Sequence, residues 1–224
     1  PIQFCEKYCQ YVDEGYTDVI HVPINRSGSS TYNNAVMAQG MLREERPEHH
    51  LNIHLLDPHT YSMVFGWYLC EMARKLQNGA ELRHVISEFE TQMNKMEVIL
   101  GPYSLKQMKK SGRISAAAAV MGELMGIRPI ITLIDGKTRV ESKVRGDDKV
   151  IPAMIDLCKK RTEGVEDFDY MIGHTSIPQA AELEKACRKA FGKAPLTTFN
   201  LGGVVSANTG PDTLALIYVG KARD

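Results

Sequence analysis

The stretch DVIHVPINRSGSSTYNNA, residues 18–35, contains the pattern that decides the fold. Its first part, residues 18–24, is short, apolar and rich in β-branched side chains, which predicts a buried strand. The next part, residues 25–30, is polar and contains glycine, which predicts a loop, and a helix is expected from about Thr31. The chain therefore passes from a strand into a helix through a loop rich in hydroxyl groups.

The same order of strand, loop and helix returns further along the chain. Residues 51–56 are expected to form a strand, and residues 62–78 a helix that Gly79 ends. Another short strand is expected at residues 97–100. Strands that alternate with helices favour βαβ units, and hence a parallel sheet covered on both faces.

The second half of the chain has a different pattern. The Asp135-Gly136 pair stands between two β-prone runs, which is a strong signal for a β-hairpin. After the hairpin we expect helices at residues 150–161 and 178–191, and strands at residues 170–173, 196–201 and 214–219. We therefore predict an α/β protein with two domains: a parallel-sheet α/β domain at residues 1–103 and an α+β domain at residues 104–224.

Composition and charge exclude several classes of protein. Lys and Arg together number 27, as do Asp and Glu, so there is no basic excess to attract nucleic acid or an anionic membrane. No apolar run reaches the roughly 18 residues that a spanning helix needs. We expect a cytoplasmic protein with no stable membrane insertion. The chain begins at Pro1 and leads almost directly into an amphipathic helix, so we expect a fragment, a processed chain or a trimmed chain.

Cysteine usage gives no sign of a metal centre. None of the five cysteines stands in a CxxC pair. Cys5 and Cys9 are four residues apart, so on a helix they share a face, and two reduced, partly buried thiols are favoured over metal ligands. No carboxylates are clustered at metal-binding spacing. We expect no metal, no cofactor and no catalytic residues.

The loop before the helix at Thr31 is a candidate anion site. Ser29, Ser30 and Thr31 place hydroxyls and free backbone N–H groups at the start of a helix, where the partial positive charge favours a carboxylate or phosphate. A serine N-cap with a flexible lead-in explains the same residues equally well.

A second candidate region is residues 104–134. Three lysines and an arginine, Arg113, crowd before a helix whose face is small and apolar. Small side chains let another helix or a slender ligand approach closely. Tight helix packing beside a solvated lysine face is the favoured interpretation from periodicity alone.

The third candidate region is the tail, residues 200–218. Gly202-Gly203 and Gly210-Pro211 predict sharp turns on either side of residues 204–207, and Asn208 and Thr209 can offer hydrogen bonds to a ligand between them. A structural turn is the favoured alternative. His174 lies between a predicted strand and a predicted helix, where it is either a ligand contact or, more commonly, a hydrogen-bonded loop histidine.

Taken together and in this order, the three regions resemble the DegV family. The segments SGSSTYNNA, KKSGRISAAAAVMGELMGIRPII and NTGPDTLALIY are similar to the family's serine loop, its glycine-arginine-isoleucine helix with the following strand, and its closing glycine-proline turn. The resemblance covers essentially the whole chain. It implies a protein that buries one long-chain fatty acid in a tunnel between two domains without transforming it, and that presents the acid to a separate fatty-acid kinase for acyl-phosphate formation.

The resemblance also implies roles for individual residues. Those expected to hold the fatty-acid carboxylate are Ser29, Ser30, Thr31, Arg113 and Asn208, with additional contacts from His174 and Thr209. Those expected to line the acyl chain are Ile114, Ala117, Met121 and Met125. Arg145 is expected at a surface that docks a partner such as the kinase.

Three features depart from the family pattern. The family's first strand and its threonine-serine motif have no counterpart here, Asn208 stands where many relatives carry histidine, and Asp212 replaces a glycine. Two other functions stay open. One is a phosphotransferase-like enzyme acting on a small anion at the serine loop, and the other is a scaffold that docks a partner through residues 106–113.

Overall fold

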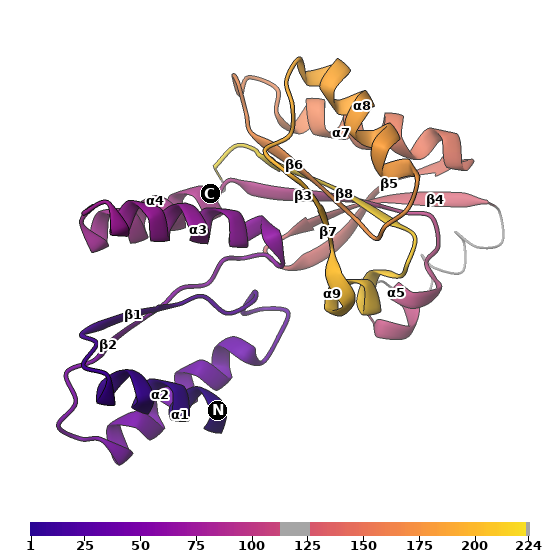
Figure 1. Ribbon diagram of the computed structural model, residues 1–224. Helices are drawn as coiled ribbons and strands as arrows, with labels where there is room; N and C mark the ends of the chain where they lie inside the picture. Colours follow the sequence, from indigo (N-terminus) through magenta and orange to yellow (C-terminus); the bar gives the residue numbers. More distant parts are fainter. Residues whose placement is uncertain (113–125, 223–224) are drawn as a thin grey trace.

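In the computed structural model, which describes residues 1–112 and 126–222, the N-terminal part forms a small α/β unit (Figure 1). It consists of α1 (Ile2–Asp13), β1 (Asp18–His21), α2 (Thr31–Glu45) and β2 (Asn52–Leu55). The two strands pair in parallel, with Asp18 opposite Asn52 and His21 opposite Leu55. The apolar faces of α1 and α2 meet in a core of their own that includes Cys5, Tyr8, Cys9, Ala38, Leu42 and Leu51.

Two antiparallel helices follow this unit, α3 (Met63–Gln77) and α4 (Leu82–Met93). The Glu81 carboxylate caps α4 by accepting hydrogen bonds from the backbone N–H groups of Arg83 and His84. Both helices pack side chains such as Met72 and Phe89 against the large sheet. Figure 1 shows the pair lying side by side between the small unit and the sheet.

The large sheet has six strands in the order β5-β4-β3-β8-β6-β7. β6 and β7 pair in parallel, and the other neighbours pair antiparallel. The strands are β3 (Met96–Pro102), β4 (Ile127–Ile134), β5 (Lys137–Arg145), β6 (Tyr170–His174), β7 (Thr198–Asn200) and β8 (Thr213–Val219).

Alternate residues of the central strands pack into two different hydrophobic cores, one on each face of the sheet, because successive side chains of a strand point to opposite faces. On β3, Ile99 faces α7 (Val150–Arg161) and α8 (Gln179–Phe191), whereas Val98 and Leu100 face α3 and α4. Two short helices, α5 (Lys106–Ser111) and α9 (Gly202–Thr209), lie together below the sheet in Figure 1. A 3₁₀ turn, Asp147–Lys149, leads from β5 into α7.

The predicted hairpin is confirmed. β4 and β5 are joined by Asp135 and Gly136, which have φ angles of 50° and 72°. Two positive φ values are what a type I′ turn requires, and the Asp-Gly pair accepts them at low cost.

The prediction of a parallel sheet was wrong for β3. The pair β1–β2 is parallel, but β3 pairs antiparallel with both β4 and β8. β3 therefore belongs to the same sheet as the strands of the second half of the chain. The predicted domain boundary at residue 103 instead groups β3 with the first half. A short run such as residues 97–100, with three apolar side chains, carries no information about a partner more than a hundred residues away.

The prediction of two sharp turns on either side of residues 204–207 was wrong. Residues 202–209 form the helix α9, with Gly202 at φ 74° near its start and Gly210 at φ 94° just after its end. The glycines mark the helix ends rather than two separate turns.

An ion pair between the half-buried Arg161 and the buried Glu97 joins the sheet to α7. The Arg161 guanidinium donates two hydrogen bonds to the Glu97 carboxylate, with Nη2 and Oε1 2.9 Å apart, and the Tyr218 hydroxyl donates to Glu97 Oε2 at 2.6 Å. Burial, together with the Glu97 charge, raises the pKa of Tyr218, so this hydroxyl keeps its proton. Within residues 1–112 and 126–222, no helix is both long and apolar enough to span a bilayer.

Candidate functional site

The loop between β1 and α2, residues 25–30, is held in shape by the side chain of Asn25. This amide is buried, and its Oδ1 accepts a hydrogen bond from the Gly28 N–H at 2.9 Å and lies 2.8 Å from the Ser27 hydroxyl oxygen. A Cβ atom at Gly28 would overlap the Tyr61 hydroxyl, so only glycine allows this close approach. We call residues 25–30 the serine loop.

The end of the serine loop presents two hydroxyls together. The hydroxyl oxygens of Ser29 and Thr31 share a hydrogen bond of 2.8 Å, and Ser29 Oγ also accepts the Thr31 N–H at 3.2 Å. α2 starts at Thr31, so these groups lie where the helix dipole is positive. Ser29 is half-buried, whereas Ser30 is exposed.

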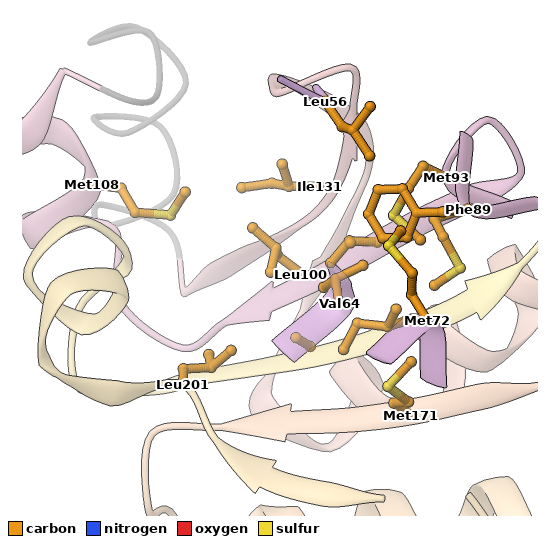
Figure 2. Close-up of a cluster of buried hydrophobic side chains, with 14 of the residues drawn as sticks. Leu56, Val64, Met72, Phe89, Met93, Leu100, Met108, Ile131, Met171 and Leu201 are labelled. Carbon is orange, nitrogen blue, oxygen red and sulfur yellow. The ribbon is translucent and has the colours of Figure 1, made fainter. Parts of the chain in front are cut away.

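A cavity of about 290 Å³ opens beside Ser29. Its walls come from the serine loop, the start of α3, the sheet, α5 and α9. Most lining side chains are apolar, and they are Ile24, Val64, Val98, Leu100, Met108, Leu133, Leu201, Val204, Val205, Ala215 and Ile217. In Figure 2, Met108 and Leu201 lie on the side of α5 and α9, and Leu100 and Val64 lie between them and Met72.

The polar part of the lining consists of neutral groups. It is formed by Ser29 and Gly28 of the serine loop, by Tyr61 and Ser62, by Gly136 and Thr138 of the hairpin, and by Asn208 and Thr209 of α9. In the part of the chain that the structure describes, no charged side chain lines the cavity. An anion bound there would be compensated by hydroxyl, amide and backbone donors.

Asn208 and Thr209 reach the cavity from the last turn of α9. Asn208 Nδ2 donates to the Val204 carbonyl at 2.9 Å, and Thr209 Oγ1 lies 3.2 Å from the Val205 carbonyl. The Ser111 hydroxyl of α5 donates to the Asn208 carbonyl at 3.1 Å, which ties α5 to α9. The structure thus brings Asn208 and Thr209 to the same cavity as Ser29, although about 180 residues separate them in sequence.

Other predicted site residues lie elsewhere. Ser30 and Arg145 are exposed, with Arg145 at the end of β5 opposite Ile127. His174 ends β6, and its Nδ1 accepts a hydrogen bond from the Ser176 N–H at 3.0 Å, which matches the loop-histidine alternative. These three residues are not among those that line the cavity. The remaining predicted contacts lie outside the described residues, and they are Arg113, Ile114, Ala117, Met121 and Met125.

Sequence reasoning missed the segment that faces the serine loop. Tyr61 and Ser62 line the cavity, and Ser62 has a φ of 60° and a ψ of −149°, a conformation that a serine adopts only under constraint. The turn of the β4–β5 hairpin also reaches this point, since the Ser27 hydroxyl donates to the Asp135 carbonyl at 2.7 Å. No local pattern marked Tyr61 or Ser62.

The fold and the cavity together define an α/β protein with an apolar chamber that ends at a hydroxyl-rich loop. The family model described as "Uncharacterised protein, DegV family" matches residues 1–221. The chain belongs to the DegV family, which confirms the resemblance noted in its sequence.

Solved structures share this fold. A fatty acid binding DegV family protein of Streptococcus agalactiae is 26% identical, with a TM-score of 0.82 over 98% of this chain and 76% of that chain. A stearic acid-binding protein of Eubacterium ventriosum is 20% identical, with a TM-score of 0.85 over 99% and 76%. The Fatty Acid Kinase (Fak) B3 protein of Streptococcus pneumoniae, loaded with linoleic acid, is 19% identical, with a TM-score of 0.79 over 97% and 76%.

Proposed function

We propose that this protein binds one long-chain fatty acid in the cavity, with the carboxylate at Ser29 and the chain against the apolar walls. The observation that carries the proposal is the arrangement of the cavity itself: apolar side chains from β3, β4, β8, α5 and α9 share its lining with Ser29 of the serine loop. The fatty-acid ligands named for the Streptococcus agalactiae and Eubacterium ventriosum proteins support the same class of ligand.

The energetics favour a molecule with one polar end. Burying each methylene of an acyl chain contributes about 0.8 kcal/mol, so a chain of about sixteen carbons supplies roughly 12 kcal/mol before ordering and association costs. An unpaired carboxylate in the same place would cost several kcal/mol. The hydroxyls of Ser29 and Thr31 and the N-terminus of α2 can offset this cost, together with Asn208, which also lines the cavity.

We further propose that the protein presents the bound acid to a fatty-acid kinase. The likeness to the Streptococcus pneumoniae Fak B3 protein supports this role, and the exposed Arg145 offers a basic contact for the partner. A bacterial fatty-acid kinase, incubated with ATP and the loaded protein, should then form acyl phosphate. Arg145→Glu should slow this step and leave the lipid content unchanged, while formation of acyl phosphate at the wild-type rate would remove Arg145 from the interface.

Lipid content tests the binding proposal directly. Solvent extraction of the purified protein followed by mass spectrometry should give a C14–C18 acid near one per chain, and the delipidated protein should take up added oleate. A protein that is free of lipid after purification and also fails to take up oleate would end the proposal.

The phosphotransferase alternative makes different demands on the site. It needs a polar pocket, whereas most of the described lining is apolar. It also predicts that the protein alone turns over phosphorylated substrates, which an assay for released phosphate would detect.

A further inference from the structure

A second cluster of functional groups lies away from the cavity, between α1 and the end of α2. Cys5 and Cys9 are one helical turn apart on α1, and both thiols are buried, with 1% and 9% of each residue exposed. Glu45, the last residue of α2, faces them. Its Oε1 lies 3.6 Å from Cys5 Sγ, and its Oε2 lies 3.6 Å from Cys9 Sγ.

We propose that Cys5, Cys9 and Glu45 form a binding site for a zinc ion. All three groups offer a ligand atom, and these atoms lie within 4.8 Å of one another. In tetrahedral zinc sites the bonds to sulfur and to carboxylate oxygen are about 2.3 and 2.1 Å long, which separates the two ligand atoms by about 3.6 Å. Each sulfur lies at that distance from one oxygen of the Glu45 carboxylate, Cys5 from Oε1 and Cys9 from Oε2. Because this carboxylate is exposed, it can turn to bring one oxygen toward an ion held by both sulfurs.

The chemistry of the ligands selects the type of metal. Thiolates are soft ligands that favour Zn²⁺ over Ca²⁺ or Mg²⁺, which prefer oxygen alone. Two thiolates and one carboxylate carry three negative charges in a partly buried place, and a divalent cation compensates most of that charge. Glu45 is exposed, so a water molecule can complete a four-coordinate site from the solvent side.

The ion would fasten two helices together. α1 is the first element of the chain, and α2 begins at the serine loop and ends at Glu45. A bond from each helix to one ion would hold α1 against α2 and stabilise the unit that carries the serine loop. From the sequence we predicted reduced thiols, because two cysteines four residues apart supply only two of the four ligands that a zinc ion needs. The carboxylate comes from 36 residues further along the chain.

Metal titration tests this site without reference to fatty acid. The protein, stripped with a chelator and kept reduced with a phosphine, should take up one Zn²⁺ per chain, and Co²⁺ should produce thiolate-to-metal charge-transfer absorption. Cys9→Ser and Glu45→Gln should each weaken Zn²⁺ binding on the order of 100-fold or more, because loss of mere outer-shell partners already costs about 10–100-fold. Cys70→Ser is the matched control, since Cys70 is exposed on α3, outside the cluster.

Several results would overturn the proposal. They are a reduced wild-type protein that takes up no Zn²⁺, a Co²⁺ complex without thiolate absorption, and Zn²⁺ binding that Cys9→Ser and Glu45→Gln leave unchanged. A protein that forms a Cys5–Cys9 disulfide in air but takes up no metal when reduced would assign the pair to redox chemistry instead. If Cys9→Ser fails to fold because Cys9 is buried, Glu45→Gln still tests the proposal, because Glu45 is exposed and its replacement does not disturb the core.

Discussion

Removal of one hydroxyl at the end of the serine loop should weaken fatty-acid binding measurably. In Ser29→Ala, the carboxylate loses a donor at the mouth of a cavity whose described lining has no charged side chain to replace it. Leaving a buried polar group under-satisfied costs about 1–3 kcal/mol. Since every 1.4 kcal/mol is a factor of ten in Kd, we expect binding to weaken about 5- to 150-fold.

The variant should leave the ligand-free fold nearly intact. Ser29 Oγ accepts the Thr31 N–H at 3.2 Å and shares a hydrogen bond with the Thr31 hydroxyl at 2.8 Å. Loss of such a cap near a helix start costs on the order of 1 kcal/mol. Displacement of a fluorescent fatty acid gives the affinity, and urea unfolding of delipidated protein gives the stability. Ser30→Ala is the matched control because Ser30 is the neighbouring serine and is exposed.

The two serine variants together decide the argument. If Ser29→Ala binds as tightly as the wild type, Ser29 does not hold the carboxylate. If Ser30→Ala loses as much affinity as Ser29→Ala, the effect belongs to the loop as a whole and the assignment to one hydroxyl is wrong.

Three further predictions concern the fold around the site. Gly28→Ala should lower the free energy of unfolding, measured by urea denaturation, by about 1–3 kcal/mol, because the new methyl group overlaps the Tyr61 hydroxyl. Adding Tyr61→Phe should recover part of this loss. If it recovers none, the strain lies elsewhere. Arg161→Met should lower the free energy of unfolding by about 3 kcal/mol, because it leaves the buried Glu97 carboxylate without its cation. The double variant Arg161→Met, Glu97→Gln should be more stable than Arg161→Met alone. Equal stability of these two variants would show that the ion pair contributes little. Burial lowers the pKa of His21, so as the pH falls the unfolded chain binds a proton at this histidine before the folded chain does. Relative to His21→Gln, the free energy of unfolding should be highest above pH about 6.5 and should decline below it by up to about 1.4 kcal/mol per pH unit. Parallel pH profiles for the two proteins would contradict this.

Local chemistry made part of this structure predictable. The β4–β5 hairpin follows from Asp135-Gly136 alone, because both residues tolerate the positive φ values that the turn needs. The serine loop could be located because its hydroxyls stand between a β-prone run and a helix. Each of these signals lies within a few neighbouring residues.

Non-local pairing was not predictable in the same way. The antiparallel register of β3 with β8, such as Val98 opposite Ile217, depends on residues about 120 positions apart. The far wall of the cavity has the same origin, since Met108 and Ala215 look like ordinary core residues until the fold brings them beside Ser29. The residue at position 45 shows its relation to Cys5 and Cys9 only when α1 and α2 are packed.

The contact between the hairpin turn and the serine loop is made by main-chain atoms on the hairpin side. The Ser27 hydroxyl donates to the carbonyl of Asp135, and Gly136 leaves room for the buried Asn25 amide. The hydrogen bond to the Asp135 carbonyl does not depend on the side chain at position 135, whose carboxylate lies 3.7 Å from His59 Nδ1. A side chain at position 136, in contrast, would overlap the Asn25 amide, so the residue types at positions 25 and 136 constrain each other. Covariation between positions 25 and 136 across homologous chains would be evidence of this steric constraint.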